Sequence, residues 1–186
     1  ELLDEPWMAK HLHIALQHTT KEMLNIMNRR NKLNSDLELF EYISSKGYAL
    51  GTDFIVGHPG ETNDIWKEAM INIHKFPITH IHPFTYSKRD GTISATMPNQ
   101  VNGNISKQRM QELSSIIKNK NKIFREDKKT LEVLIESKKD NFKDVYVGYD
   151  QFFNKVEVTS SEELVGNWIY LDDYNIVGDC NVSRFE

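Results

Sequence analysis

Cysteine is nearly absent from this chain, which holds a single one, Cys180, among 186 residues. One cysteine cannot close a disulfide within the chain, and it cannot form a thiolate metal site by itself. This cysteine usage excludes a disulfide-stabilised secreted scaffold and predicts a reducing, cytoplasmic setting.

Long apolar runs are missing as well. No segment approaches the roughly 18 consecutive apolar residues that a membrane-spanning helix needs, so we expect no membrane partner. Residues 1–7 lack the basic start and the apolar centre of a signal peptide. The chain also starts without Met, almost in the middle of an expected element, and we therefore expect it to be part of a longer protein.

Short apolar strands alternate with helices in the first 130 residues. Helices are predicted near Met23, from a capping box at Ser35 to Gly47, after a cap at Thr62, and after a cap at Ser106, which follows a loop over residues 91–104. Strands separated by helices, spaced about 30–40 residues apart, are typical of a parallel sheet. The expected strands cover residues 11–16, 49–56 and 78–84.

The pattern changes after residue 130. Short runs rich in β-branched and aromatic residues recur about every 10–15 residues, as in a small antiparallel barrel of about five strands. They cover residues 131–136, 144–149, 152–158, 167–171 and 174–178. The predicted fold class is therefore α/β: a partial (β/α) barrel of three strand–helix units in residues 1–129, followed by a small antiparallel β-barrel domain in residues 130–186.

Polar turns follow all three strands of the first part. Parallel α/β barrels form their active sites from such loops, at the C-terminal ends of the strands. Gln17 offers a donor and an acceptor, Gly57 lets a ligand approach the backbone, Glu61 could accept from ribose hydroxyls or an ammonium group, and Arg89 could bind a carboxylate or phosphate. Each residue alone also fits ordinary turn chemistry, but three such turns in succession favour a ligand site.

Charge is distributed unevenly along the chain. Residues 131–186 contain 5 Lys and Arg against 12 Asp and Glu, a balance of −7. Residues 107–129 contain eight basic side chains, among them Lys118, Lys120, Lys122 and Lys128. Such a cluster is typical either of a solvated helix face or of a surface that meets phosphates.

Histidines occur in two His-x-His pairs, His11 with His13 and His80 with His82. A His-x-His strand in a barrel can bind zinc or iron, which leaves a His-ligated metallohydrolase as an alternative. The sequence lacks a matching Asp at the end of a later strand and an H-E-x-x-H helix. The preferred interpretation therefore assigns no metal ligand to this chain.

Five motifs stand in the order in which they occur in radical S-adenosylmethionine methylthiotransferases, the family that this chain resembles over nearly all of residues 10–130. They cover residues 11–17 (HLHIALQ), 27–30, 51–62, 86–92 and 97–101. HLHIALQ, and HIHPFTYS at residues 80–87, are most similar to the MtaB type within this MiaB- and MtaB-like family. That type adds a methylthio group to N6-threonylcarbamoyladenosine beside the anticodon of tRNA; an isopentenyl adenosine or a ribosomal protein remains an alternative target.

The resemblance also implies cofactors and sites. It places Gln17, Asp53, Gly57 and Glu61 near S-adenosylmethionine, with Tyr86 and Arg89 facing the cofactor or the target base. The family cleaves this cofactor with a [4Fe-4S] cluster held by a CxxxCxxC motif, which this chain lacks. We therefore expect a C-terminal fragment, inactive alone, whose N-terminal part carries the cluster ligands. In the family, Pro-Arg-Pro usually stands where this chain has Lys88-Arg89-Asp90.

The small β domain resembles the TRAM module, which the family uses to hold tRNA. The balance of −7 opposes binding to a polyanion, although Lys138 and Lys139 could belong to a local basic face. We expect contacts with the anticodon stem-loop to involve the Lys118, Lys120 and Lys122 helix as well. A non-catalytic RNA-binding module is a further alternative. The aromatic residues Phe142, Tyr146, Phe152, Phe153 and Trp168 could stack on bases or form the barrel core.

Overall fold

A computed structural model describes residues 2–127 and 129–186 of the chain. It separates into two compact units, which are described one at a time. The α/β unit is Leu12–Lys120, and the β unit combines the chain up to His11 with Asn121–Glu186. The predicted domain boundary between residues 129 and 130 stays a prediction.

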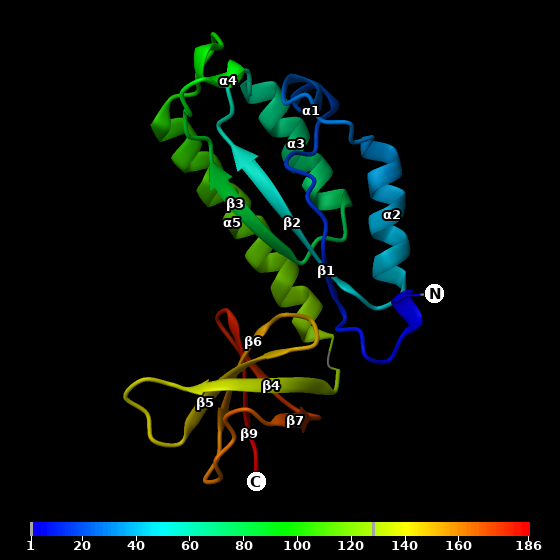
Figure 1. Ribbon diagram of the computed structural model, residues 1–186, viewed down its shortest axis with the longest axis vertical. Helices are drawn as coiled ribbons and strands as arrows, with labels where there is room; N and C mark the ends of the chain where they lie inside the picture. Colours follow the sequence, from blue (N-terminus) through cyan, green and yellow to red (C-terminus); the bar gives the residue numbers. More distant parts are fainter. Residues whose placement is uncertain (1, 128) are drawn as a thin grey trace. The chain divides into compact units, whose positions relative to one another are not determined.

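The sheet of the α/β unit has the strand order β1-β2-β3. β2 and β3 are parallel, with Gly51 opposite His80 and Val56 opposite Thr85. Their arrowheads point the same way, toward the short helix α4 (Ile93–Thr96) (Figure 1). The predicted central strand is confirmed at both ends, while β1 is shorter than predicted and β3 begins later. The strands are β1 (His11–His13), β2 (Ala49–Val56) and β3 (His80–Thr85).

Two helix boundaries follow the predicted signals. The Thr62 hydroxyl accepts from the Ile65 N–H at 3.2 Å and caps α3, and Gly47, at φ +81°, ends the chain's second helix. Of the helices in the described residues, none is both long enough and apolar enough to cross a bilayer. The helices are η1 (Leu2–Asp4), α1 (Lys21–Ile26), α2 (Leu33–Ser45), α3 (Asn63–Lys75), α4 (Ile93–Thr96) and α5 (Gly103–Glu126).

Two predicted caps are wrong. Ser35 lies inside α2, because the Asp36 N–H already donates to the Lys32 carbonyl at 2.9 Å and starts the helix earlier. Ser106 lies inside α5, which begins at Gly103. The Asn102 side chain precedes the helix and accepts from the Asn104 N–H at 2.9 Å. The predicted loop over residues 91–104 also contains the short helix α4.

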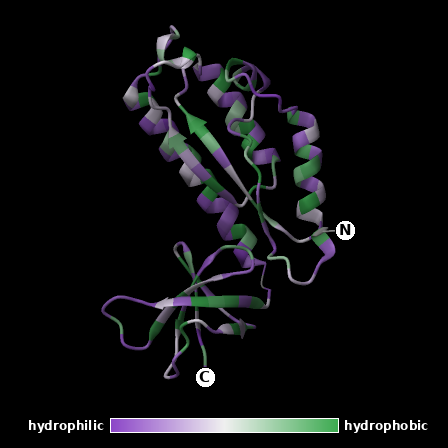
Figure 2. Ribbon diagram, in the orientation of Figure 1, coloured by the Kyte–Doolittle hydropathy of each residue, from purple (hydrophilic) through white to green (hydrophobic). Residues whose placement is uncertain are grey.

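The core of the α/β unit surrounds β2. Phe54 and Val56 are fully buried there, and Ala69 and Ile73 of α3 are fully buried as well. Hydrophobic residues alternate with hydrophilic ones along α2 (Figure 2), as expected for a helix with one buried face. Full burial of a large aliphatic or aromatic side chain contributes about 1.5–3 kcal/mol, so these side chains anchor β2 firmly in the unit.

The β unit is a curled, mixed sheet of six strands in the order β7-β4-β5-β6-β9-β8. The predicted class, a partial α/β domain followed by a small β domain, is therefore confirmed. Every second residue is buried in β5 and in the first five residues of β4, as in strands with one face on a core. The strands are β4 (Leu131–Lys138), β5 (Val145–Asp150), β6 (Lys155–Thr159), β7 (Trp168–Leu171), β8 (Asn175–Val177) and β9 (Cys180–Arg184).

The sixth strand, β9, was not predicted, and it runs parallel to β6. Its sequence is mostly polar, but the fully buried Asn181 accepts from the Arg125 guanidinium at 3.3 Å. Arg125 also donates to the Gly178 carbonyl at 2.9 Å, and its own carbonyl accepts from the Tyr174 hydroxyl at 2.7 Å. Polar contacts with Arg125 in the last turn of α5 thus hold β9 in position, and a search for alternating hydrophobic residues does not detect this strand.

Candidate functional site

A cavity of about 600 Å³ opens at the C-terminal ends of the strands in the α/β unit. This volume lies within the range of sites for small molecules and cofactors, about 300–1,000 Å³. Loops after all three strands contribute, as the sequence predicted. The lining residues are Gln17, Met27, Arg29, Ile55, His58, Phe84, Thr85, Tyr86, Ser87, Arg89, Thr92 and Ser94.

Gln17 reaches the cavity through a strained backbone. Its φ is +69°, a conformation that costs a residue other than glycine about 1–3 kcal/mol. The strain is offset by a bridge to β2, in which the Gln17 N–H donates to the Asp53 carbonyl at 3.0 Å and its carbonyl accepts from the Ile55 N–H at 2.9 Å. The sheet therefore fixes this side chain at the strand end.

Tyr86 lines the cavity with an unsatisfied hydroxyl. The Tyr86 N–H donates to the Val56 carbonyl at 2.8 Å, and its ring lies edge-on to His58 at 5.0 Å. The buried hydroxyl finds no hydrogen-bond partner within the described part of the chain. Such a group costs about 1–3 kcal/mol, and a polar ligand in the cavity would remove that cost.

Two guanidinium groups make the cavity suitable for an anion. The sequence predicts Arg89 as a site residue but not Arg29, which belongs to the motif at residues 27–30. Arg29 donates to the Ala15 carbonyl at 3.1 Å, and the turn after α1 positions it, because the Arg29 N–H donates to the Leu24 carbonyl at 2.8 Å. Guanidinium groups bind carboxylates and phosphates in a bidentate manner.

Glu61 lies apart from the cavity lining. It is only 3% exposed, and its Oε2 accepts from Arg109 Nη1 at 2.6 Å and from the Gly57 N–H at 2.9 Å. Arg109 also donates to the Glu61 carbonyl at 2.9 Å and to Asn63 Oδ1 at 2.8 Å. Oε2 is therefore satisfied by the protein, and Glu61 joins the N-terminus of α3 to α5, whereas Oε1 has no hydrogen-bond partner among the described residues.

His18 faces the other oxygen of Glu61. The His18 Nδ1 accepts from the Thr20 N–H at 3.2 Å, which places the ring proton on Nε2, 3.4 Å from Glu61 Oε1. Burial lowers the pKa of His18 below its usual 6.5, although Glu61 opposes this shift. The imidazole, which is tilted against the Phe54 ring with the ring centroids 4.7 Å apart, is therefore neutral near pH 7.

The remaining predicted cofactor residues also lie outside the lining. Gly57, at φ +79°, touches α5, and a Cβ there would lie 2.2 Å from the Ser106 hydroxyl oxygen. Asp53 is partly exposed in the middle of β2, beside His13 and His82. The structure thus brings Gln17, Tyr86 and Arg89 together, and cofactor binding by each predicted residue stays a prediction.

The curated proteins most similar to this chain over both units were compared with it. No protein-family profile matches the chain. A provisionally named methylthiotransferase of Helicobacter pylori (strain J99) is 44% identical over 180 residues, which are 95% of this chain and 42% of the relative. The homologues of the present chain are thus methylthiotransferases. The chain spans about two fifths of the length of this curated relative.

Two further methylthiotransferase relatives differ in their named substrates. The tRNA-2-methylthio-N(6)-dimethylallyladenosine synthase of Malacoplasma penetrans is 31% identical over 160 residues, 84% of this chain and 33% of the relative. The ribosomal protein uS12 methylthiotransferase of Desulforamulus reducens is 29% identical over 197 residues, 96% of this chain and 44% of the relative. Similarity to methylthiotransferases therefore extends through both units and spans two kinds of target.

On α5 of this methylthiotransferase homologue, two of the predicted basic residues, Lys120 and Lys122, contact other groups of the protein. Lys120 Nζ donates to the His74 carbonyl at 3.3 Å, and partial burial lowers the pKa of Lys120. Lys122 lies 3.6 Å from Glu126 in an exposed pair. Lys118 lies on the same helix, and Lys128 lies outside the described residues.

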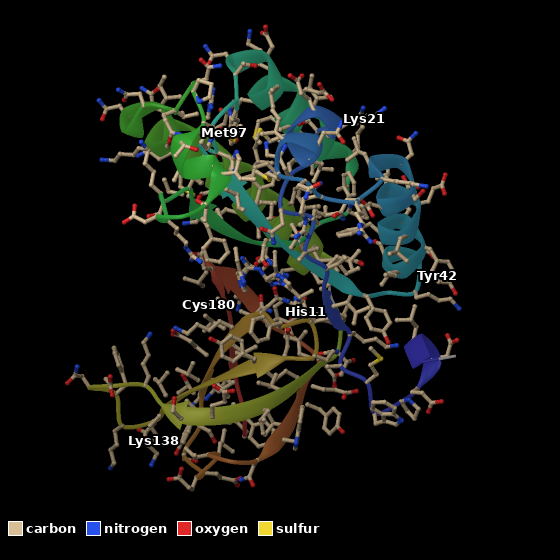
Figure 3. The ribbon with its side chains drawn as sticks, turned by 45° about the horizontal axis from the view of Figure 1, so that its top comes forward. His11, Lys21, Tyr42, Met97, Lys138 and Cys180 are labelled. Atoms are coloured by element: carbon tan, nitrogen blue, oxygen red, sulfur yellow. The ribbon has the colours of Figure 1, made fainter. Side chains whose placement is uncertain are left out.

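The two predicted lysines of the β unit are paired with carboxylates. Lys138, at the end of β4 (Figure 3), bonds to Glu163, which raises the pKa of Lys138. Lys139 lies 2.7 Å from Glu157 and lowers the pKa of that carboxyl. Their positive charges are thus locally balanced, and electrostatic attraction of RNA by this face is weaker than the lysine count suggests.

Aromatic residues of the β unit divide into core and surface. Tyr146 and Phe152 are buried, whereas Trp168 and Tyr170 of the edge strand β7 are 62% and 65% exposed. Because residues two apart point to the same side of a strand, these two rings share one face. Exposed flat rings of this kind are platforms on which nucleic-acid bases stack.

Proposed function

We propose that the chain is the C-terminal part of a radical S-adenosylmethionine methylthiotransferase that modifies N6-threonylcarbamoyladenosine beside the anticodon of tRNA. The observation that carries this proposal is the 44% identity to a methylthiotransferase relative over 95% of the chain. The subgroup rests on the HLHIALQ motif at residues 11–17 and the HIHPFTYS motif at residues 80–87. The α/β unit then forms the end of the barrel, and the β unit is TRAM-like.

The cavity fits S-adenosylmethionine. The orphaned Tyr86 hydroxyl and the Gln17 carboxamide offer hydrogen bonds to ribose or amino groups, and Arg29 and Arg89 match the carboxylate of the methionine part. When bound in such an enzyme, this cofactor is the source of a carbon radical. The residues of this chain bind and orient the nucleoside and amino-acid parts, and the buried Glu61–Arg109 pair fixes the turn after β2 that carries the lining residue His58.

An iron–sulfur cluster does not fit the residues of this chain. Such clusters are held by several cysteine thiolates, and the sequence holds only Cys180, on β9 (Figure 3). Partial burial raises the pKa of its thiol, which disfavours the thiolate form that ligates iron. We therefore assign the cluster ligands to the N-terminal part of a longer protein and derive no step through the cluster here.

For tRNA, we assign the main contacts to the β7 face rather than to the paired lysines. Trp168 and Tyr170 present two exposed rings on one side of the edge strand. Base–aromatic stacking contributes about 1–3 kcal/mol per base and is less affected by a negative net charge than phosphate contacts are. The α5 lysines would add attraction along the backbone of the anticodon stem.

Isothermal titration of this chain with S-adenosylmethionine tests the cofactor assignment. Arg89→Ala should weaken binding about 10- to 100-fold, because a hydrogen bond to a charged group contributes about 1.5–3 kcal/mol. Arg30→Ala removes an exposed arginine that lies outside the cavity lining and should leave the affinity unchanged. Equal losses for both variants, or binding that is unaffected by Arg89→Ala, would contradict the assignment.

A further inference from the structure

Three potential metal ligands meet on one face of the three-stranded sheet. His13 comes from β1, Asp53 from β2 and His82 from β3. Asp53 and His82 are register partners, and side chains at paired positions of neighbouring strands point to the same side of a sheet. None of the three lines the cavity at the strand ends.

The ligand atoms lie close enough for one ion. His13 Nε2 is 3.1 Å from Asp53 Oδ1, and His82 Nδ1 is 3.9 Å from the same oxygen. All three ligand atoms fall within 4.8 Å of one another. Bonds of about 2.0–2.2 Å to zinc place two tetrahedral ligands about 3.3–3.6 Å apart. Small rotations of the exposed His82 ring would therefore suffice to complete the site.

The carboxylate is already oriented by a neighbour. Gln17 Nε2 donates to Asp53 Oδ2 at 3.3 Å, so that Oδ1 remains turned toward the two imidazoles. Outer partners of this kind fix a metal-binding carboxylate and typically affect metal affinity 10- to 100-fold. Gln17 thereby connects this group to the cavity.

The other histidines of the two His-x-His pairs do not join the group. The His80 ring bonds to the Thr79 hydroxyl at 2.8 Å, and His11 is stacked on Phe153 in the β unit at 5.1 Å. The sequence has no Asp at the end of a later strand that could serve as the third ligand. The structure instead supplies the carboxylate from the strand between the two histidine strands.

We propose that His13, Asp53 and His82 form a binding site for a divalent transition-metal ion of the zinc type, with at least one coordination position open. Two imidazoles and one carboxylate suit Zn²⁺, Co²⁺ or Fe²⁺, whereas Mg²⁺ and Ca²⁺ prefer an all-oxygen set. The side chains of His13 and His82 are 33% and 59% exposed, so an ion can reach them from solvent. The three ligands lie outside the cofactor cavity, to which only Gln17 connects them, and the proposal does not rest on the proposed methylthiotransferase function.

Titration of the untagged chain with Zn²⁺, followed by calorimetry, tests the site, and Co²⁺ absorption reports its geometry. One ion should bind per chain. His82→Ala, which changes an exposed side chain, and Asp53→Asn should each weaken binding by roughly 100-fold or more, because a direct ligand outweighs the outer partners whose loss costs about 10- to 100-fold. Gln17→Ala should weaken it about 10- to 100-fold.

The matched controls are His74→Ala, an exposed histidine on α3, and Cys180→Ser, which removes the sole thiol. Both should bind Zn²⁺ as the unmodified chain does. The proposal is overturned if no ion binds stoichiometrically, or if His74→Ala weakens binding as much as His82→Ala does. Neither result bears on S-adenosylmethionine binding, which Arg89→Ala tests separately.

Discussion

Removal of the Arg109 side chain should destabilise the α/β unit strongly. Arg109 is 5% exposed and donates three hydrogen bonds, two to Glu61 and one to Asn63. Arg109→Met keeps most of the apolar volume but leaves the buried Glu61 carboxylate without its cation. The loss of one partner from a buried ion pair costs about 3–5 kcal/mol, most of it from the uncompensated charge.

The expected loss of stability is larger for the buried Glu61–Arg109 ion pair than for an ion pair on the surface. Lys67 and Asp64 lie 3.7 Å apart with side chains 75% and 95% exposed, and such exposed pairs contribute about 0–1 kcal/mol. Lys67→Met is therefore the matched control. The double variant Arg109→Met with Glu61→Gln should recover part of the lost stability, since it removes the buried charge as well.

Urea unfolding followed by Trp66 fluorescence measures the effect within this unit. Trp66 is buried beside Arg109, with the guanidinium 5.5 Å from the ring centre, and Trp7 and Trp168 are replaced by Phe in all variants to isolate its signal. The free energy of unfolding should fall by about 3–5 kcal/mol in Arg109→Met. A loss under about 1 kcal/mol, similar to that of Lys67→Met, would refute the reasoning.

Other consequences can be checked by stability and binding measurements. Burial lowers the pKa of His18, so below pH 6.5 the unfolded chain binds more protons than the folded chain. The free energy of unfolding should therefore fall as the pH drops below 6.5. His18→Gln should reduce this dependence when melting is measured at several pH values. Gly148→Ala places a Cβ 2.1 Å from the Leu134 carbonyl oxygen and should cost at least about 1–3 kcal/mol in urea unfolding, whereas Gly103→Ala, with no atom within 4 Å, should not. Trp168→Ala should weaken binding of an anticodon stem-loop by about 1–3 kcal/mol in fluorescence anisotropy without a change in melting temperature; unchanged RNA affinity would exclude β7 as the contact face.

Local signals predicted much of the fold. The sequence predicts a strand at residues 49–56 because the run is mainly apolar and stops in a turn rich in Gly and Pro, and the structure buries six of the eight residues on β2. Thr62 was recognised as a cap because its hydroxyl precedes a helical pattern. Ser35 carried an equally good cap signal, but backbone bonding from Lys32 overrode it. The strand β9 was missed because buried polar contacts, rather than apolar alternation, hold it.

The sequence predicts those site residues whose position in the loop after a strand is enough to bring them to the cavity. Gln17, Tyr86 and Arg89 lie in the segments that follow β1 and β3, and all three line the cavity. The environment of Glu61 was not predictable, because Arg109, which satisfies it, lies 48 residues further along. The approach of Asp53 to both histidine strands likewise depends on strand order, which the sequence of a strand does not specify.

Mass spectrometry of a host strain tests the central proposal most directly. The Arg89→Ala substitution is made in the chromosomal copy, with Arg30→Ala as the control, and tRNA nucleosides and ribosomal protein uS12 are analysed together. The proposed function predicts loss of the methylthio group from N6-threonylcarbamoyladenosine, while methylthiolation of dimethylallyladenosine and uS12 is unchanged. Loss from either of those two targets instead, or no change in any of the three, would contradict it.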